Sequence, residues 1–505
     1  MSTQGSRDTT VNTLKRLAAM RSVAGLRQPQ DLDNPACVVG ANQRCEHALV
    51  DQALNERLYA YEQRVRGRFA PIGGLLKTLS ALQHELDFAV RAQQLAQAQL
   101  GYALPQALLN DAWISGLDLR ALHAHCIFRS FKACIEGAAV DQAPWLERMA
   151  INEAFLRSCG YHTVDLSPCA DGRLQGLLPF VLRIAPNDAV TVKAYAGALF
   201  DVEADVVDWT RRELERLSGG MVGAESCNYL KIAVYHYSTS NPCHQGCAAH
   251  GSQDHLATMA ATAKLDELRA AVDNSFGRGA APETLLIGMD TDTDAIRVHL
   301  PDEQSANCPL RYAESAQLFR DTLGLSAPAA REAIARAVES AARDGGLRPG
   351  MRQLVERLLE ANLSQIEYVI QHHEGRYADI GHNERFICAG EAMSELQLRN
   401  KFYFAHLDTV EEGAPDLDVG IKIFTGLNVS RGLPVPVLVH FHYASRVPGA
   451  RERAISRCRR VRSAIESRYA SLHAQGLLHC QMAVSDQDGS ERCAWIDAST
   501  VTSGH

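Results

Sequence analysis

The chain begins with a segment that lacks a regular hydrophobic pattern and continues into amphipathic helices. Residues 1–45 are rich in Ser, Thr, Gln, Asn and Arg, and their apolar residues do not recur at helical spacing, so we expect a disordered arm. From about Glu46 the apolar residues repeat every three or four positions, which predicts amphipathic helices. One predicted face comprises Val50, Ala53, Leu54, Leu58, Tyr61 and Val65, and a second comprises Leu75, Leu79, Leu82, Leu86, Ala89 and Val90. Residues 46–150 are therefore predicted to form a helical domain, which could serve as a structural or a docking bundle.

Short, continuous apolar runs separated by helical stretches begin near residue 151. Such runs are typical of buried strands in a parallel or mixed sheet with crossover helices. The predicted strands are Leu177–Ile184, Leu230–Tyr237 and Leu285–Met289, and the predicted helices are Val206–Leu217 and Ala257–Val272. We assign residues 151–385 to this α/β domain. Residues 386–505 repeat the same texture, with Val435–Tyr443 as the clearest strand.

Two ten-residue stretches resemble each other. The sequence around His236 is AVYHYSTSNP, and the sequence around His442 is VHFHYASRVP. Each is an apolar strand that ends in aromatic-His-Tyr and is followed by a Ser-containing turn and a Pro. This likeness arises either by chance or from a duplicated α/β domain whose second copy has diverged.

Composition and charge restrict the class of protein. The 505 residues are 46% hydrophobic and 22% charged, which suits a globular protein of several domains. No window approaches about 18 uninterrupted apolar residues, and the N-terminus has no signal-peptide-like stretch, so we expect no membrane span and an intracellular protein. The net charge of −8 argues against a nucleic-acid binder, although residues 1–29 carry +4. The 14 cysteines are expected to be thiols or metal ligands.

Two clusters of side chains could carry chemistry. The first is Cys169-Ala-Asp171-Gly-Arg173, just before the predicted strand Leu177–Ile184. The second is the loop after the strand that ends near His236, and it contains Cys243, His244, Cys247 and His250. Thiolate and imidazole are the ligands that zinc prefers.

The two clusters together predict a catalytic zinc site. Cys169, one histidine and Cys247 would leave a fourth position open for water, as in catalytic rather than structural zinc sites. Asp171, held by Arg173, could accept a hydrogen bond from that water and orient it towards a small electrophile. The residues alone leave the histidine open between His236 and His244.

The run Asp290-Thr-Asp-Thr-Asp294 begins like a calcium-binding loop. Ala295 occupies the position where such a loop needs glycine, and Pro301 occupies the position of its bidentate glutamate. We therefore expect structural carboxylates at a strand end.

These motifs resemble β-class carbonic anhydrases. The longer strings YLKIAVYHYSTSNPCHQGCAAHGS, LLIGMDTDTDAIRVH and HLDTVEEGAPDLDVGIKIFTGLNVSRGLP are similar to the divergent, shell-associated carboxysomal carbonic anhydrases over about residues 45–500. The resemblance implies a helical N-terminal domain, a catalytic zinc domain and a degenerate second copy. In that family the histidine precedes the cysteine by eleven residues, which selects His236, whereas the ordinary β-class spacing selects His244. We choose His236 because it ends a predicted strand and is held rigidly.

The same resemblance implies an activity and a location. The expected reaction is the zinc-dependent interconversion of CO2 and bicarbonate inside the carboxysome, with supply of CO2 to Rubisco. The expected partners are Rubisco, shell proteins and a second copy in a homodimer, without nucleic acid or membrane. His382 is a candidate carrier for the released proton. The alternative is a shell or scaffold protein with a structural zinc, which would have no need of Asp171.

Overall fold

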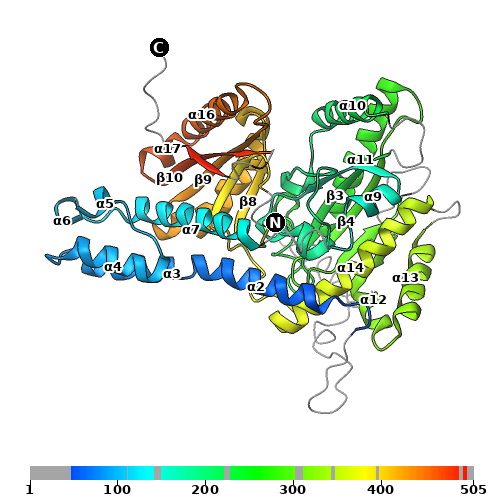
Figure 1. Ribbon diagram of the computed structural model, residues 1–505, viewed down its shortest axis with the longest axis horizontal. Helices are drawn as coiled ribbons and strands as arrows, with labels where there is room; N and C mark the ends of the chain where they lie inside the picture. Colours follow the sequence, from blue (N-terminus) through cyan, green and yellow to red (C-terminus); the bar gives the residue numbers. More distant parts are fainter. Residues whose placement is uncertain are drawn as a thin grey trace, which may run out of the picture. The chain divides into compact units, whose positions relative to one another are not determined.

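The computed structural model has a helical N-terminal region and two parallel-rich sheets, as the sequence predicts (Figure 1). The described residues are 47–110, 112–141, 149–220, 228–301, 311–342, 347–393, 397–487, 489 and 493–496. The predicted arm, residues 1–45, lies outside them. No helix in these ranges combines the length and apolar character that a bilayer span needs.

The N-terminal helices pack mainly against one another and against the second sheet. Their bounds are α2 Gln52–Phe69, α3 Pro71–Leu82, α4 Phe88–Leu100, α5 Gln106–Asn110, α6 Ala112–Ser115 and α7 Leu119–Asp141. Helix α7 contacts α2 and α3, and its Phe131 ring lies 4.8 Å from that of Phe386 in the second sheet. The predicted second helical face is wrong where it runs past Leu82. The helix ends there because Gln83 accepts a hydrogen bond from Leu117 N and donates one to Ser80 O, which stabilises a turn.

The first sheet has six strands in the order β2-β1-β3-β4-β5-β6. Strands β1 (Tyr161–Pro168), β2 (Val190–Val192), β3 (Asn228–Tyr237) and β4 (Glu283–Asp290) are parallel, and β5 (Ile296–His299) and β6 (Tyr312–Glu314) are antiparallel. The predictions of β3 and β4 are confirmed. The predicted helices are confirmed as α10 (Val202–Ser218) and α11 (Asp254–Phe276). Helices α9 (Glu153–Ser158), α12 (Ser315–Thr322), α13 (Ala327–Ala341) and α14 (Pro349–His373) complete this part.

The prediction of a strand at Leu177–Ile184 is wrong, because Leu177–Leu182 form a π-helix. Its flanking residues Gly176 and Arg183 have φ of 86° and 54°, and Pro179 lacks the amide that a central strand must donate. The whole segment is buried against α14, and a short apolar run buried on all sides does not distinguish a helix from a strand.

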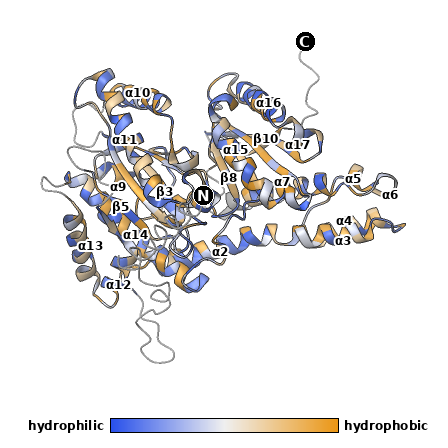
Figure 2. Ribbon diagram, turned by 180° about the vertical axis from the view of Figure 1, so that it is seen from behind, coloured by the Kyte–Doolittle hydropathy of each residue, from blue (hydrophilic) through white to orange (hydrophobic). Residues whose placement is uncertain are grey.

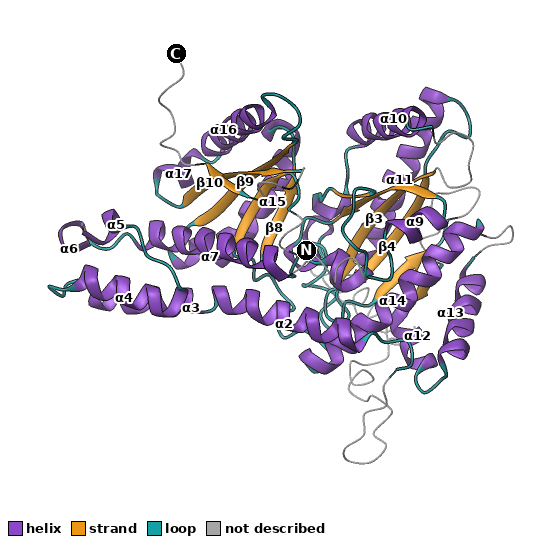
Figure 3. Cartoon of the chain, viewed as in Figure 1, coloured by secondary structure: helices purple, strands orange, loops and turns teal. Residues whose placement is uncertain are grey.

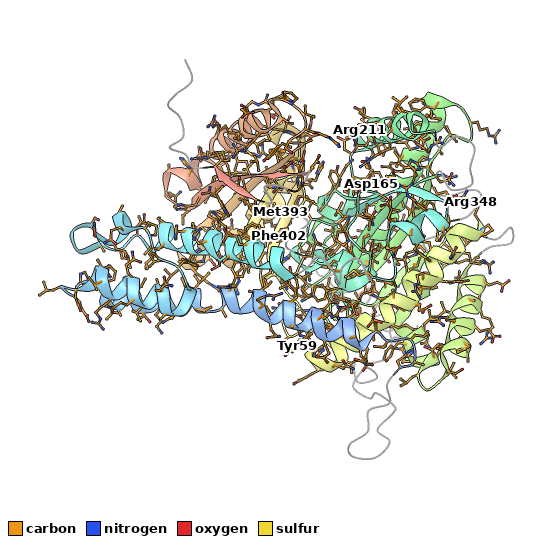
Figure 4. The ribbon with its side chains drawn as sticks, viewed as in Figure 1. Tyr59, Asp165, Arg211, Arg348, Met393 and Phe402 are labelled. Atoms are coloured by element: carbon orange, nitrogen blue, oxygen red, sulfur yellow. The ribbon has the colours of Figure 1, made fainter. Side chains whose placement is uncertain are left out.

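The pattern also missed β1, although this strand is central to the sheet. Its sequence YHTVDLSP carries polar residues that are nevertheless fully buried. Asp165, labelled in Figure 4, accepts hydrogen bonds from Lys231 Nζ at 2.8 Å and from Tyr229 Oη at 2.9 Å. The charge of Asp165 is thus balanced across neighbouring strands, and hydrophobicity alone could not reveal the strand.

The second sheet repeats the first in strand order. Its order is β11-β10-β9-β7-β8, so β8, β7, β9, β10 and β11 correspond in turn to β2, β1, β3, β4 and β5. The bounds are β7 Phe386–Gly390, β8 Phe402–His406, β9 Val435–Tyr443, β10 Leu478–Asp486 and β11 Ala494–Ile496. Strand β5 is antiparallel to β4, and its counterpart β11 is antiparallel to β10. This agreement favours duplication over chance as the origin of the likeness between His236 and His442.

Helices cover both faces of the second sheet (Figure 3). Helices α15 (Val410–Leu427) and α16 (Ala450–Arg468) contact β8 and β9–β10 respectively, α17 (Ala470–Ala474) follows, and α7 contacts β9 and β10. Hydrophobic residues concentrate on the strands, whereas α16 is mostly hydrophilic (Figure 2). The strands of the second copy are therefore mostly buried.

Lys401, at the start of β8, provides a test of how buried charge limits stability. It is 2% exposed, and burial, with the charges of Arg66 and Arg385, lowers its pKa from 10.5 to about 7. The unfolded chain keeps this proton up to about pH 10.5, so the native state gains stability as pH rises from about 7. Lys401→Met should raise the free energy of unfolding at pH 7 by about 2–4 kcal/mol.

The advantage of Lys401→Met should shrink as the pH is raised from 7 to 10, as measured by urea denaturation at each pH. Lys422→Met, at an exposed position on α15, is the matched control and should change stability little. An advantage that does not vary with pH would contradict the assignment of a neutral buried amine.

Candidate metal centre

Cys169, His236 and Cys247 come together at the carboxyl ends of β1 and β3. Cys169 follows β1 directly, and its backbone N donates to Val234 O of β3 at 3.0 Å. His236 is the penultimate residue of β3, and Cys247 lies in the loop that follows. All three are buried, and their ligand atoms lie within 4.8 Å of one another. The sequence correctly placed Cys169 at the carboxyl edge of a sheet. The strand that positions Cys169 is β1, which ends just before this residue, and not the strand predicted at Leu177–Ile184.

The donor set fits a tetrahedral metal ion. The two sulfurs are 3.9 Å apart, and two sulfurs bound to one zinc at about 2.3 Å lie roughly 3.8 Å apart. Both ring nitrogens of His236 are buried and lack a hydrogen-bond partner of acceptable geometry among the described residues. A buried imidazole without partners, aimed at two thiols, is the arrangement expected where a cation completes the site.

The protonation of the two thiols points the same way. The contact with Cys247, followed by burial, raises the pKa of Cys169 well above its ordinary value, and the same contact lowers the pKa of Cys247. The contact between the two sulfurs therefore favours one thiol and one thiolate over two thiolates. Two adjacent buried thiolates require a neighbouring cation, because their charges repel and water is excluded.

The alternative ligand lies elsewhere. His244 and Cys243 are exposed on the loop after β3. Neither belongs to the group of side chains that converge with the two thiols. The structure thus brings His236, and not His244, to Cys169 and Cys247.

Asp171 and Arg173 form a buried ion pair beside the three side chains. Arg173 donates from Nε to Asp171 Oδ1 at 2.9 Å and from Nη2 to Oδ2 at 2.7 Å, and its backbone N also donates to Oδ1. Arg173 Nη1 donates to Gln245 O and Ile380 O, which fixes the guanidinium. Asp171 Oδ2 lies 3.6 Å from His236 Nε2. Burial would raise the pKa of Asp171, but the charges of Arg173 and of the neighbouring His382, together with the hydrogen bonds from Arg173, outweigh burial and hold the pKa well below its usual range.

His382 lies at the same site. Its Nδ1 is 2.9 Å from Glu384 Oε1 and 3.9 Å from Asp171 Oδ2, and its side chain is 24% exposed. Burial lowers the pKa of His382, but Asp171 and Glu384 together raise it by more than burial lowers it. The net shift of this pKa is therefore upward. Glu384, to which the sequence motifs assign no role, also accepts a hydrogen bond from Gly172 N at 3.1 Å. Its position two residues after His382 was the available signal.

The Asp290–Asp294 run supports the loop after β3, as expected of structural carboxylates. Asp290 is the last residue of β4 and accepts hydrogen bonds from Thr239 N and Oγ1. Asp292 accepts from Ser238 Oγ and Ser240 N. The buried carboxylates therefore fasten the start of the loop that carries Cys247.

The second copy replaces the metal-site residues at corresponding positions. Glu391 N donates to His440 O at 2.9 Å, the same bond that Cys169 N makes with Val234 O, so Glu391 occupies the place of Cys169. Glu391 accepts from Arg457 Nη1 at 3.0 Å. His442 Nε2 donates to Ala392 O at 2.8 Å. Met393, labelled in Figure 4, stands two residues after Glu391 as Asp171 does after Cys169. The residue in the place of Cys169 is thus paired with a guanidinium.

We expect one metal ion per chain, because Glu391 takes the place of the ligand Cys169 in the second copy. His442→Ala should lower the free energy of unfolding by about 1 kcal/mol, since Ala392 O loses its part-buried donor. It should leave metal content and turnover unchanged. Elemental analysis and urea denaturation measure both effects, and two metal ions per chain would refute a degenerate copy.

Comparison with known proteins gives a consistent result along the chain. The family models for the N-terminal, catalytic and C-terminal domains of Carboxysome Shell Carbonic Anhydrase match residues 47–139, 151–382 and 383–500. The carboxysome shell carbonic anhydrase of Parasynechococcus marenigrum is 50% identical over 449 residues, which cover 88% of this chain and 77% of that protein. The protein of the same name from Halothiobacillus neapolitanus is 44% identical over 466 residues, covering 90% and 91%.

Proposed function

Since the chain belongs to the carboxysome shell carbonic anhydrase family, we propose that it interconverts CO2 and bicarbonate with a zinc ion held by Cys169, His236 and Cys247. It is therefore a carbonic anhydrase of the carboxysome. The observation that carries the zinc assignment is the buried Cys2His group beside an arginine-held carboxylate. The proposed domains are residues 46–150, 151–385 and 386–505, after the arm 1–45.

The residues around the three ligands have separate roles in this proposal. A bound zinc ion would act as a Lewis acid and lower the pKa of a coordinated water. The ion pair with Arg173 stabilises the ionised form of Asp171. Its Oδ2 therefore remains an acceptor that can orient a water next to His236. His382 combines contact with Asp171 and partial exposure, which suits a side chain that carries a proton from the site to solvent.

A test of the proposal is the rate of CO2 hydration by the purified, zinc-loaded chain in a stopped-flow instrument. Saturable hydration that is lost on chelation and restored by zinc is the expected result. A scaffold protein with a structural zinc would bind the metal but show no hydration above the buffer rate. That result would reject the enzymatic proposal and leave the metal site.

We propose that the product CO2 supplies Rubisco and that Rubisco and shell proteins are partners of the arm. The arm carries +4 over residues 1–29, whereas the whole chain is at −8. A basic segment gains charge-assisted contacts on an acidic surface. Deleting residues 1–45 should leave hydration intact and reduce co-sedimentation with Rubisco or shell, and added salt should weaken the intact complex. Unchanged or salt-insensitive association would assign docking to the helical domain.

The β-class resemblance also leads us to propose a homodimer or a multiple of dimers. Sedimentation of the purified chain over a range of concentrations measures this, and a monomer at micromolar concentration would contradict it.

A further inference from the structure

The short turn η4, Ala196–Ala198, lies against the sulfur of Cys169. Gly197 N donates to Cys169 Sγ at 3.3 Å. A backbone donor to a ligand sulfur draws charge from it and fixes the direction of its lone pairs. The turn is therefore part of the surroundings that set how Cys169 binds a metal.

This turn does not hold its shape through local preference alone. Gly197 and Ala198 have φ of 69° and 60°, and a non-glycine residue in the left-handed region is strained. A Cβ atom at Gly197 would lie 2.6 Å from His250 Nε2. A strained turn in close contact persists only when its surroundings restrain it.

Two side chains provide restraints on opposite sides of η4. Asp416 Oδ1, on α15 of the second copy, accepts a hydrogen bond from Ala196 N at 2.6 Å. His250 Nε2, in the catalytic part, donates to Gly197 O at 3.2 Å. The two bonds hold the peptide units on either side of the amide that points at Cys169.

The second copy also contacts the backbone on both sides of the metal site. Phe404 N, in β8, donates to Ala170 O at 3.0 Å, and Asn400 N, two residues before β8, donates to Gly172 O at 2.7 Å. The two bonds lie on either side of Asp171. His406 N donates to Ala194 O at 3.0 Å, just before η4. Tyr403 Oη donates to Asp416 O at 2.9 Å, which ties α15 to the same strand.

We infer that the degenerate second copy is a positioning element of the metal site, in which Asp416 holds η4, with His250 opposite, so that Gly197 N donates to the Cys169 sulfur. The inference rests on the proposed assignment of Cys169 as a metal ligand. Asp416 touches neither substrate nor metal and acts through the turn. Its loss should weaken metal binding and make the sulfur more electron-rich.

The test compares Asp416→Ala, Asp416→Asn and Asp418→Ala. Asp418 lies on the same helix, is exposed and pairs with Arg468, so it is a matched control. Loss of zinc from each holoenzyme to a chelator should be about 10-fold more favourable in Asp416→Ala than in wild type. Asp416→Asn should recover most of the affinity, because its amide oxygen can still accept from Ala196 N.

A spectroscopic readout separates positioning from general destabilisation. In the cobalt-substituted protein, the sulfur-to-cobalt charge-transfer band should move to lower energy in Asp416→Ala, because a sulfur without its backbone donor gives up an electron more easily. Asp418→Ala and Asp416→Asn should keep the wild-type band. If Asp416→Ala does not fold, His250→Ala removes the restraint on the other side and should show the same shift.

Wild-type affinity and an unshifted band in Asp416→Ala, or in His250→Ala where that variant replaces it, would overturn the inference while leaving the zinc assignment intact. A wild-type protein that binds neither zinc nor cobalt would overturn both. Equal loss of affinity in Asp416→Ala and Asp418→Ala would also overturn it, because α15 would then act only through stability.

Discussion

His236→Ala should abolish stoichiometric metal binding and lower the hydration rate by about a thousandfold or more. The proposed site has three protein ligands, and two thiols alone leave the metal too weakly held to compete with a chelator. Without the metal, no group in the site can make water acidic near neutral pH. The fold should survive, because His236 makes no hydrogen bond of acceptable geometry with the described residues that its loss would break.

The measurement is metal content by elemental analysis together with stopped-flow hydration of the same sample. His244→Ala is the matched control, since it removes an exposed histidine from the adjoining loop, and it should keep both metal and rate. Cys169→Ser and Cys247→Ser should behave like His236→Ala. Full metal occupancy in His236→Ala with loss in His244→Ala would reverse the ligand assignment.

Asp171→Asn should keep the metal and lose about 10²–10⁴-fold in hydration rate. The neutral amide places an NH2 group where one carboxylate oxygen accepts from Arg173, and it removes the negative charge that is hydrogen-bonded to that guanidinium. The orientation of water beside His236 is then lost, whereas Cys169 and Cys247 remain in place.

Metal content and turnover of Asp171→Asn distinguish a role in orienting water from a role in maintaining the ligand geometry. Asp188→Asn, at an exposed position of the same domain, controls for the change in charge and should keep the full rate. A turnover within a few fold of wild type in Asp171→Asn would reject the orienting role. Loss of the metal would show instead that Asp171 maintains the ligand geometry.

The sequence predicted what depends on local pattern and on motifs of fixed spacing. The runs that became β3, β4 and β9 are apolar because parallel strands are covered on both faces. The resemblance to a known family, together with the position of His236 at a strand end, chose this histidine over His244. The structure brings it to the two thiols.

The sequence could not predict what depends on partners distant in the chain. Strand β1 was hidden because its Asp165 is balanced by Lys231, 66 residues away. The π-helix at Leu177–Leu182 has the composition of a strand, and its shape follows from packing against α14. Only the folding of the chain brings Glu384 and Asp416 to the site. They accept hydrogen bonds from backbone amides that lie 212 and 220 residues away in the sequence.

The attachment of the second copy to the catalytic copy within one chain makes their contact independent of protein concentration. If Asp416 and β8 belonged to a separate subunit, dilution would remove them from η4 by mass action. Within one polypeptide, the second copy meets the first at an effective concentration on the order of millimolar or above. Dilution should therefore leave the restraint on Cys169 in place, even where contacts between separate chains dissociate.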